Sequence, residues 1–292
     1  MQSTNLEVQS LINRVQSVYP GFVIHSARWL GSGQNNDVVV FNNSWIFRFP
    51  HNNLAAINLE NEAVILRSLK GILSVKIPVP QYVNLEPTHA SRSFMGYQMI
   101  AGVPLSTERV KNIDAAGLNI LARQLDEFLI SLHTLPIPKE VADRVSVTNT
   151  FDYWSDMYER IQQLLFSHMR TEARAEVRHL FESFLQSVGN FNLALIHGDF
   201  GAGNILVDES SERVVGVIDF GSVGVGDPAV DYAAVSTIHP QMLDLIAIHN
   251  PSVEKYIQRI KYYKGTFALQ EALYGAETGD EGAFRSGLEQ YI

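Results

Sequence analysis

The 292-residue sequence contains no cysteine. This absence excludes disulfide bonds, thiolate nucleophiles and cysteine-liganded zinc sites. Carboxylates, histidines and backbone amides are therefore the groups available for chemistry. We expect any metal bound by the chain to be a hard cation with oxygen ligands.

Long apolar runs and clusters of basic residues are also missing. The longest apolar runs, such as VVVF at 38–41 and LALI at 193–196, are far too short to span a bilayer. The first residues show no basic segment followed by an apolar one. The net charge is −9 and the 22 Lys and Arg residues are scattered, whereas nucleic-acid binding depends on clustered cations. We expect a cytoplasmic monomer with neither a membrane nor a nucleic acid as partner.

Hydrophobic residues make up 46% of the chain, which is ample for a packed core. Apolar residues at helical spacing predict an opening helix over residues 3–18 and a second helix over 54–70, closed by Gly71. Segments rich in β-branched and aromatic residues, with turn residues between them, predict five strands, at 22–30, 37–41, 45–49, 77–83 and 93–100. The first hundred residues therefore predict an antiparallel sheet with one helix inserted before its last two strands.

The remainder of the chain is mainly helical. Residues 101–106 are typical of a linker, and helical periodicity then dominates, at 120–135, 154–169, 172–188 and from 229 to the C-terminus. Short strand-like segments interrupt it at 193–199, 204–209 and 214–221. We expect an α+β, bilobal molecule, with a nucleotide-binding lobe at 1–100, a larger helical catalytic and substrate-binding lobe at 101–292, and a cleft between them.

Two short segments, HGDFGAGN at 197–204 and IDFG at 218–221, contain the densest set of chemically useful residues. Asp199 can orient and deprotonate a hydroxyl group, while the Asn204 amide and the Asp219 carboxylate offer oxygen atoms to Mg²⁺. Such a site needs bound nucleotide phosphates to complete the metal's ligands. The alternative is that these residues only build turns between strands.

The pattern H-G-D-x4-N followed by I-D-F-G resembles the catalytic and metal-binding segments of the aminoglycoside phosphotransferases, which are relatives of the protein kinases. Further segments, in the same order, resemble the 2''-aminoglycoside branch: YPGFVIHSARWLGSGQNNDVVVFNNSWIFRFP, NEAVILRSL, YQMIAGVPL, GDPAVDYA and ALYGAETGD. The resemblance implies a protein-kinase-like fold and transfer of the γ-phosphate of GTP or ATP to a hydroxyl of an aminoglycoside.

The resemblance also implies roles for individual residues. Asp199 would be the catalytic base, with His197 supporting its loop, and Asn204 and Asp219 would be the magnesium ligands. The glycine turn LGSGQNND, with Ser32 and Gly33, would cover the nucleotide phosphates. A plain β-turn is the alternative for that segment.

Arg48 occupies the strand position at which kinases have a phosphate-binding lysine, and Glu62 matches its carboxylate partner. A guanidinium group can bind both phosphate and carboxylate, although an exposed Arg–Glu pair would give the same sequence pattern. The backbone at Gln98 and Ile100 would bind a purine edge, and Tyr97 would narrow the space behind it. We therefore expect GTP to be used at least as well as ATP.

The acceptor is less clearly defined by the sequence. A polycationic aminoglycoside calls for carboxylates in its pocket. Our candidate is Glu271 on a predicted helix, between Phe267 and Tyr274, and the alternatives are Asp280 and Glu281 in the loop beyond. The segment after GDPAVDYA carries a single acidic residue, Asp244. Macrolides, sugars or amino alcohols therefore remain alternative acceptors, and a non-catalytic nucleotide-binding module is the alternative to an enzyme.

Two further motif residues, Asp227 and Asp231 in GDPAVDYA, would be structural supports of the catalytic loop by the same resemblance. The remaining histidines, including His133, show no spacing typical of a metal site. We interpret them as surface or packing residues.

Overall fold

The computed structural model describes residues 5–187 and 192–292, and the chain forms two compact units. The first unit comprises Met1–Leu105, Pro136–Val145 and Gly203–Val223. The second comprises Ser106–Leu135, Ser146–Ala202 and Gly224–Ile292. The start of the expected opening helix and the end of the helix expected at 172–188 lie outside the described residues.

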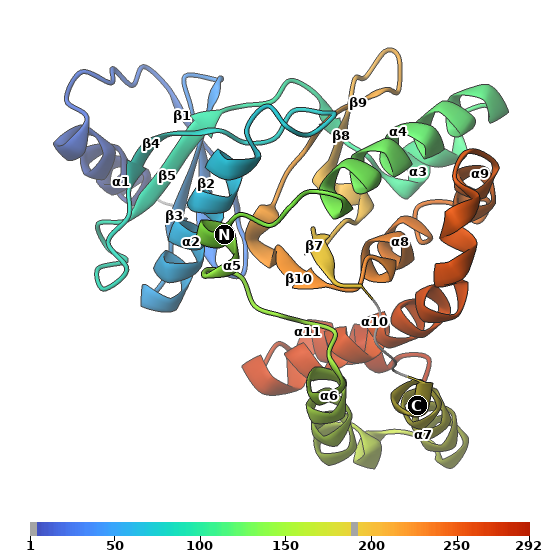
Figure 1. Cartoon of the computed structure of the whole chain (residues 1–292). Coiled ribbons are helices and arrows are strands. Elements are labelled where there is room, and N and C mark those ends of the chain that lie inside the picture. The colour runs from blue at the N-terminus through green and yellow to red at the C-terminus, as the bar shows by residue number, and fades with distance from the viewer. Residues whose placement is uncertain (1–4, 188–191) are drawn as a thin grey trace. The chain divides into compact units, whose positions relative to one another are not determined.

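The first unit is built on a five-stranded antiparallel sheet, as expected (Figure 1). Its strands are β1 (Ala27–Ser32), β2 (Asn36–Phe41), β3 (Trp45–Pro50), β4 (Pro80–Asn84) and β5 (Phe94–Gln98). They are arranged in the order β1-β2-β3-β5-β4. Helix α2 (Asn53–Leu69) follows β3 in the chain, so the predicted order of elements is confirmed.

The two faces of this sheet pack against different helices. Helix α1 (Asn5–Val18) covers one face through a buried apolar cluster, which contains Leu11, Val15, Val39, Phe41, Phe47, Phe49 and Phe94. Because side chains alternate along a strand, Arg48 between Phe47 and Phe49 points to the opposite face. Helix α2 packs against that face and is capped by Asn52, whose side chain accepts a hydrogen bond from the amide of Ala55.

A second, three-stranded sheet in the first unit consists of β6 (Val103–Pro104), β8 (Ile205–Val207) and β9 (Val214–Val217), in that order. The expected linker at 101–106 thus contains a strand, which forms only because β8 supplies a partner distant in sequence. The β8–β9 turn is fixed by Asp208, which accepts hydrogen bonds from Ser210 and Ser211. These bonds lower the pKa of Asp208 to about 2.

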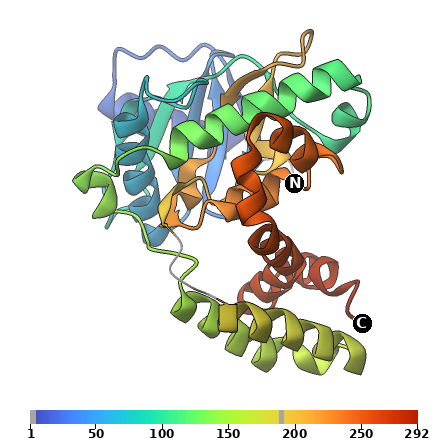
Figure 2. The same ribbon diagram turned by 45° about the vertical axis from the view of Figure 1, so that its right-hand side comes forward.

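The second unit is mainly helical (Figure 2). Its α-helices are α3 (Thr107–Lys111), α4 (Ala115–His133), α6 (Phe151–Leu164), α7 (Thr171–Ser187), α8 (Ala229–Val235), α9 (Met242–His249), α10 (Ile257–Thr278) and α11 (Glu281–Leu288). The short helix α5 (Lys139–Ala142) belongs to the first unit. In both views α6 and α7 lie near α10 and α11, and both contact α10.

The second unit contains a two-stranded sheet, and its first strand leads directly into the HGDFGAGN segment. Strand β7 (Ala194–Ile196) lies within the strand expected at 193–199. Its partner is β10 (Gly224–Gly226), which was not expected because three residues with two glycines carry no strand signal. Within the described parts of the chain, no helix is long and apolar enough to cross a membrane.

Candidate active site

Arg48 and Glu62 form a buried ion pair in the first unit. The Arg48 guanidinium lies 2.5 Å from a Glu62 carboxylate oxygen, and the side chains are only 13% and 2% exposed. An exposed Arg–Glu pair is therefore excluded. Burial alone would lower the pKa of Arg48, but its electrostatic interactions with Glu62, Tyr97 and Asp219 together outweigh that effect, so the pKa is raised. Burial raises the pKa of Glu62, and the positive charge of Arg48, which stays protonated, opposes that rise.

Asp219, the acidic residue of the IDFG segment, lies beside this pair. Its carboxylate is 3.6 Å from the Arg48 guanidinium and is half exposed. Its backbone is left-handed, with φ of 62°, which is uncommon outside glycine and marks a constrained position. The amide of the next residue, Phe220, hydrogen-bonds to Glu62. A single buried carboxylate thus organises both Arg48 and the IDFG segment.

Asn204 lies at the same end of the β8–β9 hairpin as Asp219. The Ile218 amide donates to the Asn204 carbonyl at 2.9 Å, which continues the ladder beyond Ile205 and Val217. The short 3-10 turn Ala202–Asn204 carries the asparagine. One amide oxygen and one carboxylate suit a hard cation that takes its other oxygen ligands from phosphates and water. No group of three or more His, Cys, Asp or Glu residues that could hold a metal occurs in the described chain.

The glycine turn between β1 and β2 is closed by local hydrogen bonds. The Gly33 amide donates to the Asn36 carbonyl at 2.9 Å, and the Ser32 hydroxyl donates to Asp37 at 2.7 Å. Ser32 and Asp37 are paired across the two strands, so their side chains point to the same face of the sheet. The Ser32 hydroxyl is therefore engaged within the turn.

The end of β5 and the residues after it contain the backbone groups of Gln98 and Ile100, which the sequence analysis expects to bind a purine. Tyr97 is buried, and burial raises its pKa to about 12. It pairs with Ile46 and so lies on the Arg48 face, whereas Gln98 pairs with Trp45 on the α1 face. The Met99 amide donates to the Ser44 carbonyl at 2.8 Å, which fixes the strand end next to Ile100.

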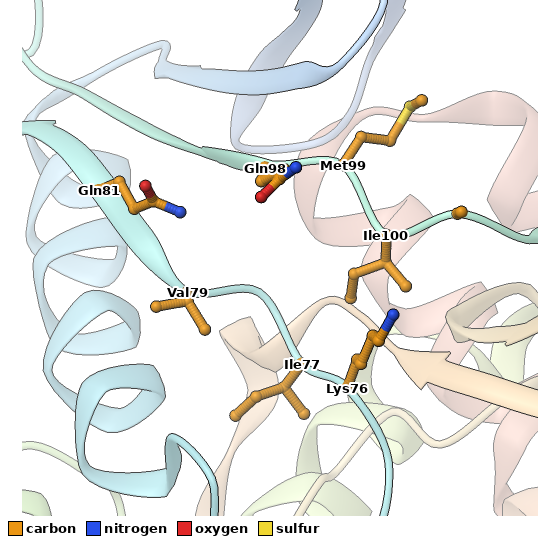
Figure 3. A pocket seen from close by; sticks show the side chains of 8 residues that line it. Lys76, Ile77, Val79, Gln81, Gln98, Met99 and Ile100 are labelled. Carbon is orange, nitrogen blue, oxygen red and sulfur yellow. The ribbon is translucent and has the colours of Figure 1, made fainter.

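A pocket of about 390 Å³ lies along the Gln98 side of this segment. Figure 3 shows side chains from two chain segments around it. Its lining consists of Lys76, Ile77, Val79, Gln81, Gln98, Met99, Ile100 and Ala101. Neither Arg48 nor Tyr97 is among the residues that line this pocket.

The second unit holds the HGD segment through one buried carboxylate. Asp231, at the start of α8, accepts hydrogen bonds from the backbone amides of His197 and Gly198, each at 2.9 Å. The buried His197 ring in turn accepts a hydrogen bond from the Asp199 amide, at 3.3 Å. Asp199 itself is exposed. The loop backbone is thus anchored while its acidic side chain is left at the surface of the unit.

His133 is a site residue that the sequence interpretation missed. Its ring nitrogen lies 2.9 Å from Asp231, and its side chain is 8% exposed. Burial alone would raise the pKa of Asp231, but the interactions with His133 and with the ring and backbone amide of His197 together outweigh it and lower the pKa. His133 and Asp231 are 98 positions apart, and no sequence motif links them. Only the folded structure reveals their contact.

The acceptor candidates lie on α10, whose first half is tied to the GDP segment. Asp227 is buried and accepts hydrogen bonds from Arg259 and Tyr263. Phe267, Glu271 and Tyr274 follow at spacings of four and three residues, so they share one face of the helix. Both aromatic residues are partly buried and Glu271 is exposed.

Comparison with known proteins gives the family. The sequence model of the phosphotransferase enzyme family matches residues 26–246. The chain therefore belongs to the phosphotransferase enzyme family, and the resemblance to aminoglycoside phosphotransferases is confirmed. The fold is the kinase-like fold of that family, and the chain is an enzyme rather than a non-catalytic binding module.

The individual relatives have low sequence identity to this chain. The viomycin phosphotransferase of Streptomyces vinaceus is 28% identical over 264 residues, which cover 89% of this chain and 90% of the relative. The GDP and kanamycin complex of APH(2'')-IIia superposes with a TM-score of 0.88 at 23% identity, covering 96% of each chain. Macrolide 2'-phosphotransferase type I superposes with a TM-score of 0.78 at 18% identity, covering 100% of this chain and 99% of that one. At such low identity, the two structures show the fold alone.

Replacing Asp231 tests the anchoring of the loop. We expect Asp231→Asn to lower the free energy of unfolding at pH 7 by about 3 kcal/mol, because a buried hydrogen-bonded charge is lost. The folded-state pKa of Asp231 lies below its ordinary 3.8, so its contribution is complete above that value and is lost as the pH falls through the folded pKa. Urea unfolding between pH 7 and 3 should show the difference from wild type shrinking below about pH 4; a difference independent of pH would contradict this role.

Proposed function

We propose that the protein transfers the γ-phosphoryl group of a nucleoside triphosphate to a hydroxyl group of an aminoglycoside antibiotic in the cytoplasm, with Mg²⁺ bound by Asn204 and Asp219. The observation that carries the proposal is the network of Arg48, Glu62 and Asp219. It holds a buried guanidinium beside the half-exposed carboxylate of the IDFG segment. This arrangement suits the binding of a magnesium polyphosphate, because the guanidinium can neutralise phosphate charge and the carboxylate can bind the metal ion.

The chain's residues have separate tasks in this mechanism. Arg48 neutralises phosphate charge, and the glycine turn encloses the phosphates. Asp199 accepts the hydrogen bond of the acceptor hydroxyl and takes its proton as the new P–O bond forms and the bond to the nucleoside diphosphate breaks. When bound, Mg²⁺ supplies charge neutralisation at the phosphate oxygens. His197, held by Asp231, keeps the Asp199 backbone in place.

The donor is proposed to be GTP at least as readily as ATP. Tyr97 is buried beside the purine-binding segment and narrows the space for the base. The GDP complex of APH(2'')-IIia, which has the same fold, supports a guanine nucleotide.

The acceptor assignment rests on α10. Arg160 Nε lies 2.8 Å from a carboxylate oxygen of Glu277 on this helix. Glu271, in contrast, forms no ion pair with any residue in 5–187 or 192–292. Glu271 is thus able to bind an ammonium group, with Phe267 and Tyr274 as its flat neighbours. The likeness to a viomycin phosphotransferase favours a second candidate, another hydroxylated antibiotic, for the same machinery.

An activity screen tests the proposal directly. Release of nucleoside diphosphate should be measured with GTP and with ATP in the presence of kanamycin, viomycin, a macrolide or a simple amino sugar. We expect turnover with kanamycin and a kcat/KM for GTP at least equal to that for ATP. Turnover restricted to the amino sugar would contradict an antibiotic acceptor, and a more than tenfold preference for ATP would contradict the donor assignment.

Two substitutions separate chemistry from nucleotide binding. Asp199→Ala should lower kcat at least about a hundredfold, the usual contribution of a general base, while the Kd of the magnesium nucleotide stays nearly unchanged. Asp219→Ala should abolish measurable binding of the magnesium nucleotide because a metal ligand is removed. Isothermal titration and steady-state kinetics give both quantities.

Asp143→Ala is the matched control, since Asp143 is an exposed aspartate of the first unit whose carboxylate forms no hydrogen bond or ion pair with a site residue in the described chain. This variant should behave as wild type. Equal losses of nucleotide affinity in the Asp199 and Asp219 variants would show that the two carboxylates do not have these separate tasks.

A further inference from the structure

His51, the residue after β3, contacts the glycine turn between β1 and β2. The His51 ring nitrogen Nε2 lies 2.9 Å from Asp37 Oδ1 and 3.4 Å from the Ser32 hydroxyl. Its other ring nitrogen, Nδ1, lies 3.3 Å from the Gln34 carbonyl. The His51 backbone amide also donates to the Asn35 carbonyl at 2.9 Å. One residue thus contacts the turn at four points.

These contacts lie on the α1 face of the sheet. Asp37 pairs with Ser32 on one side and with Phe49 on the other, and Phe49 belongs to the cluster packed against α1. Residues opposite each other in an antiparallel pair point to the same face. His51 therefore fixes the shape of the turn from the face opposite Arg48.

The chemistry of the partners defines the charge state that completes the contacts. A carbonyl oxygen and a carboxylate oxygen can only accept hydrogen bonds, so both His51 ring nitrogens must donate. Both nitrogens carry hydrogen only in the imidazolium form. In the neutral form one nitrogen would direct a lone pair at its oxygen partner, and that contact would be lost.

We propose that His51 is a positioning residue for the nucleotide phosphates, holding the glycine turn closed when its imidazole is protonated and releasing it when the imidazole is neutral. The inference rests on the proposed function, because it takes the turn to cover the phosphates. The turn itself, not His51, touches the nucleotide.

The charged and polar groups that face His51 come from three elements of the first unit. Asp37, on β2, is the carboxylate that faces it, and Ser32, on β1, contributes only a hydroxyl. Arg14, on α1, lies over the Phe49 ring at 5.4 Å and interacts electrostatically with Asp37. Protonated His51 therefore neutralises the Asp37 carboxylate within the turn, and Arg14 shares that task at every pH.

Nucleotide affinity as a function of pH tests the proposal. The Kd of GDP with Mg²⁺ should be measured by isothermal titration from pH 5.5 to 8.5 for wild type and for His51→Gln, which can make only one of the two ring contacts. The terminal phosphate of GDP also titrates near pH 6, so its contribution is common to both proteins. We expect the wild-type Kd to rise about three- to tenfold more than that of the variant across this range, as expected for one charge-assisted contact.

His89→Gln is the control, because His89 is a more exposed histidine of the same unit whose carboxylate neighbour, Glu86, is 3.7 Å away. It should keep the wild-type pH profile. Thermal melting at pH 6 and 8 checks that His51→Gln stays folded. Parallel pH profiles for wild type and His51→Gln would overturn the role of His51 while leaving the proposed function intact. Wild-type protein that binds no nucleotide at any pH would overturn the proposed function and this inference with it.

Discussion

The buried ion pair between Arg48 and Glu62 is the contact on which the proposed nucleotide site of this enzyme depends. Burying two charges is costly unless each finds partners, and a buried carboxylate left alone would cost several kcal/mol. Here Glu62 is bound by Arg48 and by the Phe220 amide, while Arg48 also faces Asp219. The helix α2, the central strand β3 and the IDFG segment are thereby fixed to one another within the first unit.

The second unit also contains a buried carboxylate, Asp231, which holds the backbone of the HGD segment. Asp231 is as buried as Glu62, yet its pKa is lowered whereas that of Glu62 is raised. The difference follows from the partners, because Asp231 receives two backbone amides and the His133 ring. Several directed hydrogen bonds stabilise the charged form more than burial disfavours it. In both units a buried carboxylate positions a loop, and the nearby carboxylate that we propose to take part in the reaction, Asp219 as a metal ligand or Asp199 as the base, remains exposed.

Local sequence patterns predicted most of the elements. The strands of the large sheet, the position of α2 and the segments around Asp199 and Asp219 follow from periodicity and from the family resemblance. Features that depend on distant partners were not predictable. Strands β6 and β10 are too short to carry a signal of their own, and the inclusion of 203–223 in the first unit is set by packing. His133 and His51 act through contacts that no spacing in the sequence encodes.

The most direct test of the account is the affinity of Glu62→Gln for a magnesium nucleoside triphosphate. Glutamine keeps the size of Glu62 but removes its negative charge. That charge holds the Arg48 guanidinium and strengthens the hydrogen bond from the Phe220 amide. The account predicts that this variant stays folded, as judged by circular dichroism, while its Kd for GTP rises at least about tenfold, the effect of one lost charge-assisted contact. A folded variant with wild-type affinity would contradict it.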